Sequence, residues 1–228
     1  MFRLNKILIS ITIIALISSG ISLIYGRDFY TEGSINSKKV ALTFDDGPGA
    51  STNAILEILK SKNVKATFFL LGSRAKANPN DARRIAQEGH EIGNHTYHHI
   101  NFFSYKKDDK ESQIESELVS SGKIIEEVSG VKPRLVRFPY GYSRPDSINI
   151  AKKYGYTVIN WSFGCDWQKK IQDGDMLKKY KKAISGGAIF LLHDAPRNAK
   201  SLKFLSKLID EIKNKGFEIV TVSELLGL

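Results

Sequence analysis

The sequence predicts an α/β fold in which parallel strands and helices alternate around a barrel, and three observations lead to it. Seven short apolar runs recur from Lys38 onward. Amphipathic segments of helical periodicity lie between them, which is the pattern of parallel βα units. Charged or histidine side chains that could act in catalysis or bind a metal follow five different runs. In a barrel, the ends of the strands form one active-site face. An open doubly wound sheet, the alternative, gathers residues from fewer strand ends.

Each predicted strand is a short run rich in apolar residues. The runs are 40–44, 64–71, 91–94, 134–138, 157–162, 188–192 and 217–222. The predicted helices have apolar residues spaced three and four apart, which gives each helix one apolar face. They span 53–60, 112–128 and 201–215, and Gly216 is a natural C-cap for the last. No linker, repeat or low-complexity segment interrupts this alternation, so residues 38–228 are expected to form one domain.

The beginning of the chain predicts export. Arg3 and Lys6 precede an uncharged apolar stretch at residues 7–26, as in a secretory signal peptide. The stretch is also long enough to span a bilayer, so an uncleaved membrane anchor is the alternative. We expect a signal peptide or membrane anchor at residues 1–26 and a short tether at 27–37. The protein would be secreted, periplasmic, or anchored in the membrane and facing outward.

The net charge indicates which kinds of partner to expect, and the cysteine count excludes an internal disulfide. The formal net charge of +10 favours anionic wall polymers, lipid head groups or acidic glycans. No basic-aromatic recognition module is visible, so no nucleic acid partner is expected. Cys165 is the only cysteine, so no internal disulfide can form. A monomer is expected.

Two adjacent carboxylates end the first predicted strand. Asp45 and Asp46 follow the apolar run and precede Gly47-Pro48, as at a strand end that opens into a site. Adjacent carboxylates repel each other. A metal ion on one of them would relieve that repulsion and leave the other free to act as a base.

A pair of histidines offers the remaining metal ligands. His95 and His99 are four residues apart, and on a helical turn that spacing places both rings on one face. Two imidazoles and one carboxylate make a three-ligand set with open positions for water and substrate. His98 lies between them, and its ring is expected to point off their face.

Two further strings place polar groups after apolar runs. They are Arg137-Phe138-Pro139-Tyr140-Gly141 and Leu191-Leu192-His193-Asp194. With the two earlier motifs, in this order, they make the chain resemble the polysaccharide deacetylases, the NodB-homology family 4 of carbohydrate esterases. The resemblance covers about Lys38 to the C-terminus. It implies a distorted (β/α) barrel with about seven parallel strands and the hydrolysis of N-acetyl groups on a glycan.

The resemblance also implies roles for the matching residues. Asp46, His95 and His99 would hold one divalent ion, with zinc expected and cobalt, nickel, manganese or iron also suited to the ligands. Asp45 would be the general base, and the backbone N–H of Tyr140 would stabilise the oxyanion. His193 would protonate the leaving amine.

Other residues would support or surround these groups. Arg137 would pair with Asp45, and Asp166 would fix the tautomer of His193 and raise its pKa. The substrate groove would be lined by Trp167, Leu191, Pro139 and Tyr140. The family's Asp-x-x-Asp-Trp segment reads Phe163-Gly164-Cys165-Asp166-Trp167 here, so Phe163 replaces the first Asp. This departure concerns the wall of the groove and therefore substrate preference.

Three further polar residues near the motifs are expected to have structural roles. His90 is expected to pack or cap, Asp194 to shape a loop, and Cys165 to be a small buried thiol.

Two other functions stay open beside glycan deacetylation. One alternative is the same fold and metal site acting on a non-sugar amide. The other is a catalytically silent glycan-binding module, which the intact base, ligands and acid argue against. The glycan itself stays open among peptidoglycan, chitin-type oligomers, a secreted polyglucosamine and a lipid-linked sugar.

Overall fold

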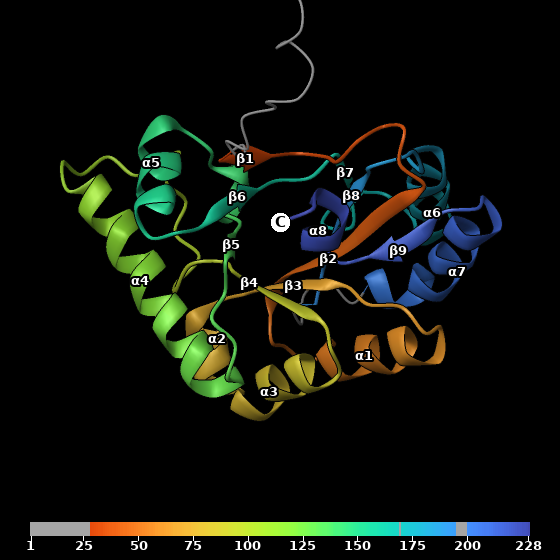
Figure 1. The fold of residues 1–228 in the computed structure, drawn as a ribbon, viewed down its shortest axis with the longest axis horizontal. Coiled ribbons are helices and arrows are strands. Elements are labelled where there is room, and N and C mark those ends of the chain that lie inside the picture. Colours follow the sequence, from red (N-terminus) through yellow and green to blue (C-terminus); the bar gives the residue numbers. More distant parts are fainter. Residues whose placement is uncertain (1–27, 169, 195–199) are drawn as a thin grey trace, which may run out of the picture.

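Strands and helices alternate along most of the described part of the chain (Figure 1). The computed structural model describes residues 28–168, 170–194 and 200–228. Its strands are β1 (Phe29–Tyr30), β2 (Lys39–Gly47), β3 (Thr67–Leu70), β4 (Glu91–Asn94), β5 (Leu135–Val136), β6 (Thr157–Ile159), β7 (Phe163–Gly164), β8 (Ile189–His193) and β9 (Glu218–Val220). Its helices are α1 (Thr52–Ser61), α2 (Gly72–Ala77), α3 (Pro79–Gln87), α4 (Lys110–Ser129), the 3₁₀ turn η1 (Pro139–Gly141), α5 (Pro145–Lys153), α6 (Asp173–Lys182), α7 (Lys200–Asn214) and α8 (Val222–Leu226).

The predicted signal or anchor at residues 1–26 lies outside the described residues. Within the described ranges, no helix combines the length and the apolar character needed to cross a bilayer.

The strands form one parallel sheet that curls into a distorted, partly open barrel. The order is β1-β6-β5-β4-β3-β2-β8-β7, and β9 pairs with the first part of β2. Ala41 of β2 pairs with both Ile189 of β8 and Val220 of β9, while β3 joins β2 only from Thr43 onward. Therefore β9 and β3 share one side of β2, and the barrel widens there. All seven predicted strands are present, and the predicted distorted α/β barrel is confirmed.

Two short strands, β1 and β7, escaped prediction because neither lies in an apolar run of its own, unlike the equally short β5. One of them, β1, falls in the stretch predicted as a tether, which is wrong for these residues, because Phe29 and Tyr30 pair with β6. The chain then reaches the other edge of the barrel, where the Gly33 N–H donates to the Gly187 carbonyl at 2.8 Å. Gly187 has φ of 75°, and a Cβ there would lie 2.5 Å from the Gly33 carbonyl carbon, so only glycine fits. Residues 28–37 thus bridge the open side of the barrel.

Apolar side chains pack together in the barrel interior. One residue from each of five strands meets there together with Val222 of α8: Ala41, Phe69, Leu135, Ile159 and Ile189. The start of α8 is held at the amino ends of two strands, because the Val222 N–H donates to Thr67 Oγ1 at 2.9 Å and Ser223 bonds to Glu91. Figure 1 shows α8 within the ring of strands. This helix therefore closes one end of the barrel and leaves the carboxyl ends of the strands for the site.

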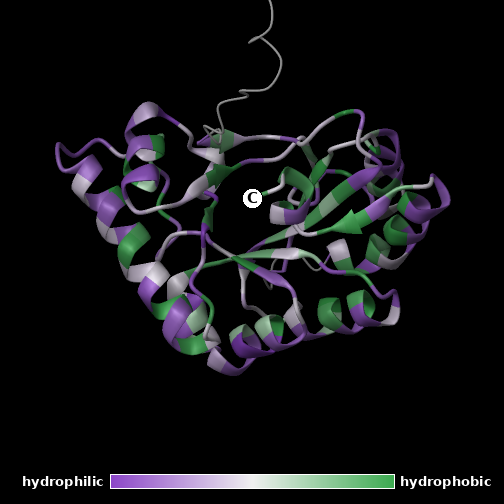
Figure 2. Ribbon diagram, in the orientation of Figure 1, coloured by the Kyte–Doolittle hydropathy of each residue, from purple (hydrophilic) through white to green (hydrophobic). Residues whose placement is uncertain are grey.

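The helices cover the outside of the barrel with their apolar faces turned inward. Figure 2 shows hydrophobic residues on the strands and on the strand-facing sides of the helices, and hydrophilic residues on the outer sides. The three predicted helices correspond to α1, α4 and α7. Gly216 follows α7 with φ of 77°, as expected of a C-cap.

Candidate metal centre and active site

A single cavity at the carboxyl ends of the strands collects most of the predicted site residues. Its volume is about 340 Å³. The lining residues are Asp45, Asp46, His95, His99, Tyr140, Trp161, Trp167, Leu191 and His193. They come from the ends of β2, β4, β5, β6, β7 and β8. The strands gather these groups because parallel strands present their carboxyl ends on one face of a barrel.

A β-bulge lets both adjacent carboxylates face the cavity. Successive residues of a regular strand point to opposite faces. Here the register between β2 and β3 shifts between Asp45 and Gly47, and Asp46 has φ of 72°. Arg74 of α2 donates to the Asp46 carbonyl at 2.8 Å and holds this backbone.

The histidine pair lies on a loop, and the predicted helical turn is wrong. Residues 95–99 follow β4 without helical hydrogen bonding. The rings converge because Thr96 and His99 have φ of 70° and 63°, which turns the chain sharply. The Asn94 side chain secures the turn by accepting the Thr96 N–H at 2.8 Å.

Glu117 of α4 holds the same loop from outside, and the sequence analysis did not identify it. Its Oε2 accepts the backbone N–H groups of Tyr97 and His98 at 2.9 and 2.7 Å, and its Oε1 lies 2.6 Å from His98 Nδ1. The Glu117 side chain is only 2% exposed, whereas that of His98 is 65% exposed. His98 therefore points away from the cavity, as expected. The sequence feature that could have identified Glu117 is its position between Ile114 and Leu118, which places a carboxylate beside the apolar face of the helix.

Asp46, His95 and His99 fit a metal ion. Asp46 Oδ1 lies 3.4 Å from His95 Nε2 and 3.2 Å from His99 Nε2. Ligand atoms about 2.0 to 2.1 Å from a tetrahedral ion lie about 3.3 to 3.4 Å apart. Asp46 Oδ1 is buried and makes no hydrogen bond of good geometry within the described chain, as expected of an atom shaped to hold a cation. His95 Nδ1 lies 2.5 Å from the Arg137 carbonyl, so Nδ1–H donates there and Nε2 stays available as a ligand.

The electrostatics of the site agree with this arrangement. Burial alone raises the pKa of Asp46, but its contacts with His95 and His99 and their charges outweigh burial and lower the pKa well below its ordinary value. Asp46 is therefore an anion across the physiological range, ready for a cation. In the described ranges, this trio is the one group of at least three His, Cys, Asp or Glu residues able to share an ion.

Arg137 pairs with Asp45 beneath the cavity, as the resemblance implied. Arg137 Nη1 donates to Asp45 Oδ1 and to Thr43 Oγ1, both at 2.7 Å. Its Nε and Nη2 donate to the carbonyls of Ile159 and Asn160 at 3.1 and 2.9 Å. The guanidinium is fully buried, so these bonds compensate for its lost hydration. One oxygen of Asp45 is thereby tied down, while Oδ2 lies 3.7 Å from His95 Nε2.

His193 is held by a buried carboxylate on the opposite side of the cavity. Asp166 Oδ1 lies 2.8 Å from His193 Nδ1, and Oδ2 accepts the His193 backbone N–H at 2.8 Å. Burial alone lowers the pKa of His193, but the hydrogen bond and charge of Asp166, with the charges of Asp45 and Asp46, raise it to about 9. His193 is therefore protonated at neutral pH, with Nε2–H left to donate. Asp166 follows the short strand β7 rather than the predicted strand at 157–162.

Asp194 shapes the turn after β2. Its Oδ2 accepts a hydrogen bond of 2.6 Å from Thr52 Oγ1, and its backbone N–H donates to the Asp45 carbonyl at 3.2 Å. Burial raises the pKa of Asp194 to about 7, against the lowering by Thr52. A Cβ on residue 47 would lie 2.3 Å from Asp194 Oδ2, so glycine is required there.

Aromatic side chains form the walls of the cavity. Trp161 and Trp167 meet edge to face with ring centroids 6.3 Å apart, and the Tyr140 ring lies 4.9 Å from that of His99. Trp161 was not identified as a site residue from the sequence, because it fell inside the strand predicted at 157–162; the observed β6 ends at Ile159, so Trp161 lies just beyond the strand end. Pro139 is buried and does not line the cavity, unlike Tyr140, Trp167 and Leu191.

Two residues of the Asp-Trp segment and one isolated histidine pack elsewhere. Phe163 packs against Tyr180 of α6 with ring centroids 5.0 Å apart, so its side chain belongs to the layer between barrel and helices. Cys165 is buried, and its N–H donates to the Tyr180 hydroxyl at 3.1 Å. His90 is buried and its Nδ1 accepts the Ala66 N–H at 3.1 Å, so all three have packing roles.

Unusual backbone conformations concentrate at the site. Among the described residues, the non-glycine residues with positive φ are Asp46, Asn63, Thr96, His99 and Tyr140. All but Asn63 lie at or beside the cavity. Such conformations cost about 1 to 3 kcal/mol each and persist where the surrounding structure enforces them. Tyr140, with φ of 59°, turns its backbone N–H away from regular hydrogen bonding, and no described backbone carbonyl accepts it.

Comparison with known proteins gives the same family that the sequence motifs predicted. The family model described as polysaccharide deacetylase matches residues 32–159. A peptidoglycan-N-acetylglucosamine deacetylase of Bacillus cereus is 36% identical over 197 residues, which are 85% of this chain and 70% of that protein. The peptidoglycan-N-acetylmuramic acid deacetylase PdaA of Bacillus subtilis is 32% identical over 213 residues, 90% of this chain and 78% of that protein.

A solved structure agrees over nearly the whole chain. The Bc1960 peptidoglycan N-acetylglucosamine deacetylase superposes with a TM-score of 0.82 at 32% identity, covering 92% of this chain and 97% of the other. The fold and the site thus define a hydrolase that deacetylates a glycan. The chain belongs to the polysaccharide deacetylase family, as its motifs predicted.

Proposed function

We propose that this deacetylase removes the acetyl group from N-acetylated amino sugars of peptidoglycan. The observation that carries the proposal is the meeting of three groups around one cavity: the Asp46, His95 and His99 trio, the Asp45–Arg137 pair and the His193–Asp166 pair. The names of the relatives support peptidoglycan as the polymer, and more of those reported name N-acetylglucosamine than N-acetylmuramic acid. N-acetylglucosamine is therefore the proposed sugar.

The metal ligands in this proposal are Asp46, His95 and His99, and zinc suits their two nitrogens and one oxygen. A divalent ion bound there supplies a Lewis acid that polarises a carbonyl and lowers the pKa of water. The remaining steps belong to side chains and backbone of this chain.

Asp45 acts as the general base. Arg137 fixes one of its oxygens, and the other faces the cavity, where it removes a proton from the attacking water. The new bond joins the water oxygen to the acetyl carbonyl carbon. The Tyr140 N–H donates to the developing oxyanion, for which its left-handed backbone conformation leaves it available.

His193 completes the reaction as the general acid. Its Nε2–H gives a proton to the amide nitrogen as the carbon–nitrogen bond breaks, and the products are acetate and a free amine. Asp166 keeps the proton on the correct nitrogen and keeps the ring charged. Leu191 and the two tryptophans offer an apolar wall for the acetyl methyl group and the sugar.

We further propose that the enzyme acts outside the cytoplasm. Peptidoglycan is an external polymer, and the apolar stretch at residues 7–26 would direct export as a signal or hold the enzyme on the membrane. The domain is expected to work as a monomer, because all proposed groups come from one chain.

The test is acetate release from a panel of glycans. Purified, metal-loaded enzyme is incubated with peptidoglycan, chitin oligomers and poly-N-acetylglucosamine, and mass spectrometry locates any sugar that has lost its acetyl group. We expect acetate from peptidoglycan, with loss at N-acetylglucosamine. Loss only at N-acetylmuramic acid would contradict the proposed sugar. Acetate from none of the glycans would contradict the proposed function.

A further inference from the structure

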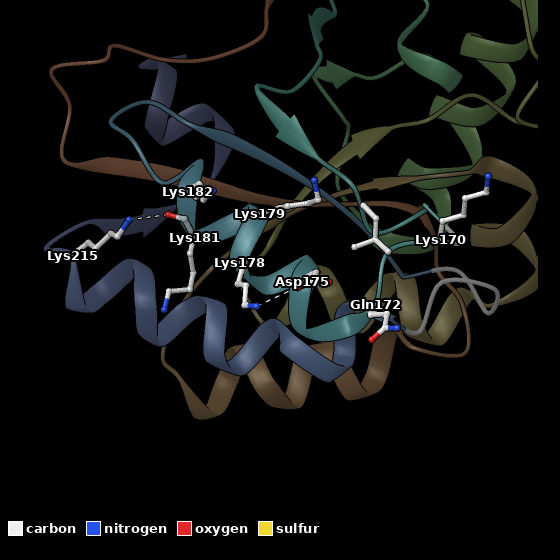
Figure 3. A pocket seen from close by; sticks show the side chains of 9 residues that line it. Lys170, Gln172, Asp175, Lys178, Lys179, Lys181, Lys182 and Lys215 are labelled. Carbon is white, nitrogen blue, oxygen red and sulfur yellow. Dashed lines mark hydrogen bonds and ion pairs between the residues drawn. The ribbon is translucent and has the colours of Figure 1, made fainter.

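A group of lysines on α6 and its surroundings lies outside the catalytic cavity. It borders an open hollow of about 870 Å³ that contains one carboxylate, Asp175. The α6 lysine band consists of Lys170, Lys178, Lys179, Lys181, Lys182 and Lys215. Figure 3 shows Lys170 and Lys215 at the two ends of this band and the others between them. The band therefore extends along the helix rather than converging on one point.

Much of the positive charge in the band is not neutralised. Within the described ranges, Lys170, Lys179 and Lys182 are exposed and make no ion pair, whereas Lys181 Nζ lies 2.6 Å from Glu211 Oε1. Lys178 Nζ lies 3.3 Å from Asp175 Oδ1, with the two side chains 76% and 61% exposed. Such exposed pairs contribute about 0 to 1 kcal/mol and exchange easily for another anion. Clustered ammonium groups raise the local potential and attract a partner of opposite charge.

The side chains of the band suit phosphate as the negatively charged group of the partner. Every cation in it is a lysine, and lysine is a common phosphate ligand in proteins, which it binds as a point charge. The extended row of separate charges matches a polymer with repeated phosphates better than one small anion.

Two other anionic partners fit less well. An anionic membrane attracts clustered lysines too, but an apolar face that enters the lipid strengthens such binding, and none of the large exposed hydrophobic residues of the described chain belongs to α6. Single-stranded nucleic acid is held by aromatic rings that stack on bases, and no aromatic residue borders the hollow. We infer that the α6 lysine band binds a linear polymer of phosphates or phosphodiesters.

The position of the band would give this binding a use. Helix α6 follows the loop that carries Asp166 and Trp167, and Lys170 is three residues beyond Trp167. A phosphate polymer lying along α6 would pass close to the mouth of the catalytic cavity. It would hold the enzyme near glycan that carries or adjoins such a polymer, which raises the effective substrate concentration.

The test is binding of medium-chain inorganic polyphosphate at several salt concentrations. The variant replaces Lys178, Lys179 and Lys182 by Gln, and its control replaces Lys106, Lys107 and Lys132, exposed residues near the two ends of α4. If the three α6 lysines each contact one phosphate, the slope of log K against log salt should shrink by about 2 in the variant. Affinity at low salt should fall about tenfold or more, and the control should stay close to the parent.

Several outcomes would overturn the inference. They are no binding of polyphosphate, equal losses in both triple variants, and binding of phosphatidylglycerol vesicles or of an oligonucleotide in preference to polyphosphate. Thermal unfolding checks that both variants are folded. Acetate release from a soluble N-acetylated oligosaccharide should be unchanged in the α6 variant, so this inference and the proposed deacetylation can fail separately.

Discussion

At the scale of single residues, two adjacent carboxylates have different neighbours. Asp45 is 3% exposed and bound by Arg137, whereas Asp46 faces His95 and His99. The bulge in β2 produces this division, because it turns both side chains toward one cavity. In the proposed function, Asp46 accordingly binds the metal ion and Asp45 accepts the proton of the attacking water.

Substituting each carboxylate by its amide should separate these roles. Asp45→Asn keeps the shape but cannot take a proton, so kcat should fall about 10²-fold or more while metal stays bound. Asp46→Asn should weaken metal binding, because a neutral amide is a poorer ligand than a carboxylate. Calorimetric metal titration and acetate release measure the two effects. If Asp45→Asn lost metal and Asp46→Asn retained it, the assignment would be reversed.

His193 should limit the reaction at high pH. Asp166 raises the pKa of His193 above its ordinary value, and an acid must be protonated to act, so the rate should fall as the pH rises through this raised pKa. Asp166→Asn removes the main raising charge and should move this fall to lower pH. The exposed Asp175→Asn is the control and should leave the profile in place. An unchanged alkaline limb in Asp166→Asn would contradict the role of Asp166.

The same group makes stability depend on pH. The pKa of folded His193 lies above its ordinary value of 6.5, so the protonated form is favoured by folding. Its contribution to the free energy of unfolding should be full below about pH 6.5 and should be lost as the pH rises to about 9. Chemical denaturation of metal-free protein across this range measures it, and an Asp166→Asn protein should show a smaller loss. Equal losses in the two proteins would count against this pair.

At the scale of elements, helix α4 supports the loop that carries the two proposed histidine ligands, His95 and His99. Glu117 reaches from the buried face of α4 and accepts two backbone N–H groups of that loop. Ordered donors to a buried carboxylate form strong hydrogen bonds, which suits a loop with two left-handed residues. The helix therefore helps to position two proposed metal ligands that it does not itself contribute.

Weakening this support should reduce metal affinity. Glu117→Gln keeps one acceptor oxygen and loses the charge, so metal affinity should fall about 10- to 100-fold, the scale typical of groups that orient ligands. Glu127→Gln on the exposed side of α4 is the matched control. Metal titration and thermal unfolding are measured together. A loss of stability in Glu117→Gln with unchanged metal affinity would mean that Glu117 serves folding alone.

At the scale of the whole molecule, the barrel has one closed end and one functional end. Helix α8 packs on the interior cluster and bonds to the amino ends of β3 and β4, while the cavity occupies the carboxyl ends. The interior cluster therefore fixes the relative positions of the strands that carry the site.

Removing part of that cluster should lower stability markedly. Ile189→Ala deletes a fully buried side chain inside the barrel and should cost about 2 to 5 kcal/mol of unfolding free energy. Ile35, which is 74% exposed, gives the control, and Ile35→Ala should change stability by less than about 0.5 kcal/mol. Urea denaturation compares them. Similar values for both would show that the interior cluster does not stabilise the barrel.

Much of this molecule could be predicted from sequence because its regular parts have local signals. Seven apolar runs gave seven strands, and the polar residues after them meet at one end of the barrel. Family motifs supplied the pairs Asp45–Arg137 and His193–Asp166, which no spacing in the chain could have shown.

The parts of the fold and of the site that could not be predicted depend on contacts between segments distant in the sequence. The bulge at Asp46 needs β3 and Arg74 beside it, and the histidine loop needs Glu117, so neither has a periodic signal. The strands β1 and β7 have no apolar run of their own, and they form because β6 and β8 offer edges with which they can pair. A helical turn for the histidines was the simplest explanation of their spacing, and tertiary contacts replaced it.

The most direct test of the central claim is to titrate metal-free enzyme with zinc while measuring acetate released from peptidoglycan. The account predicts that the rate rises in proportion to added zinc and levels off near one ion per chain, as three converging ligands imply. His95→Ala, which removes one ligand, should stay inactive through the same titration. Full activity in the metal-free enzyme, or zinc-dependent activity in His95→Ala equal to that of the parent, would contradict the account.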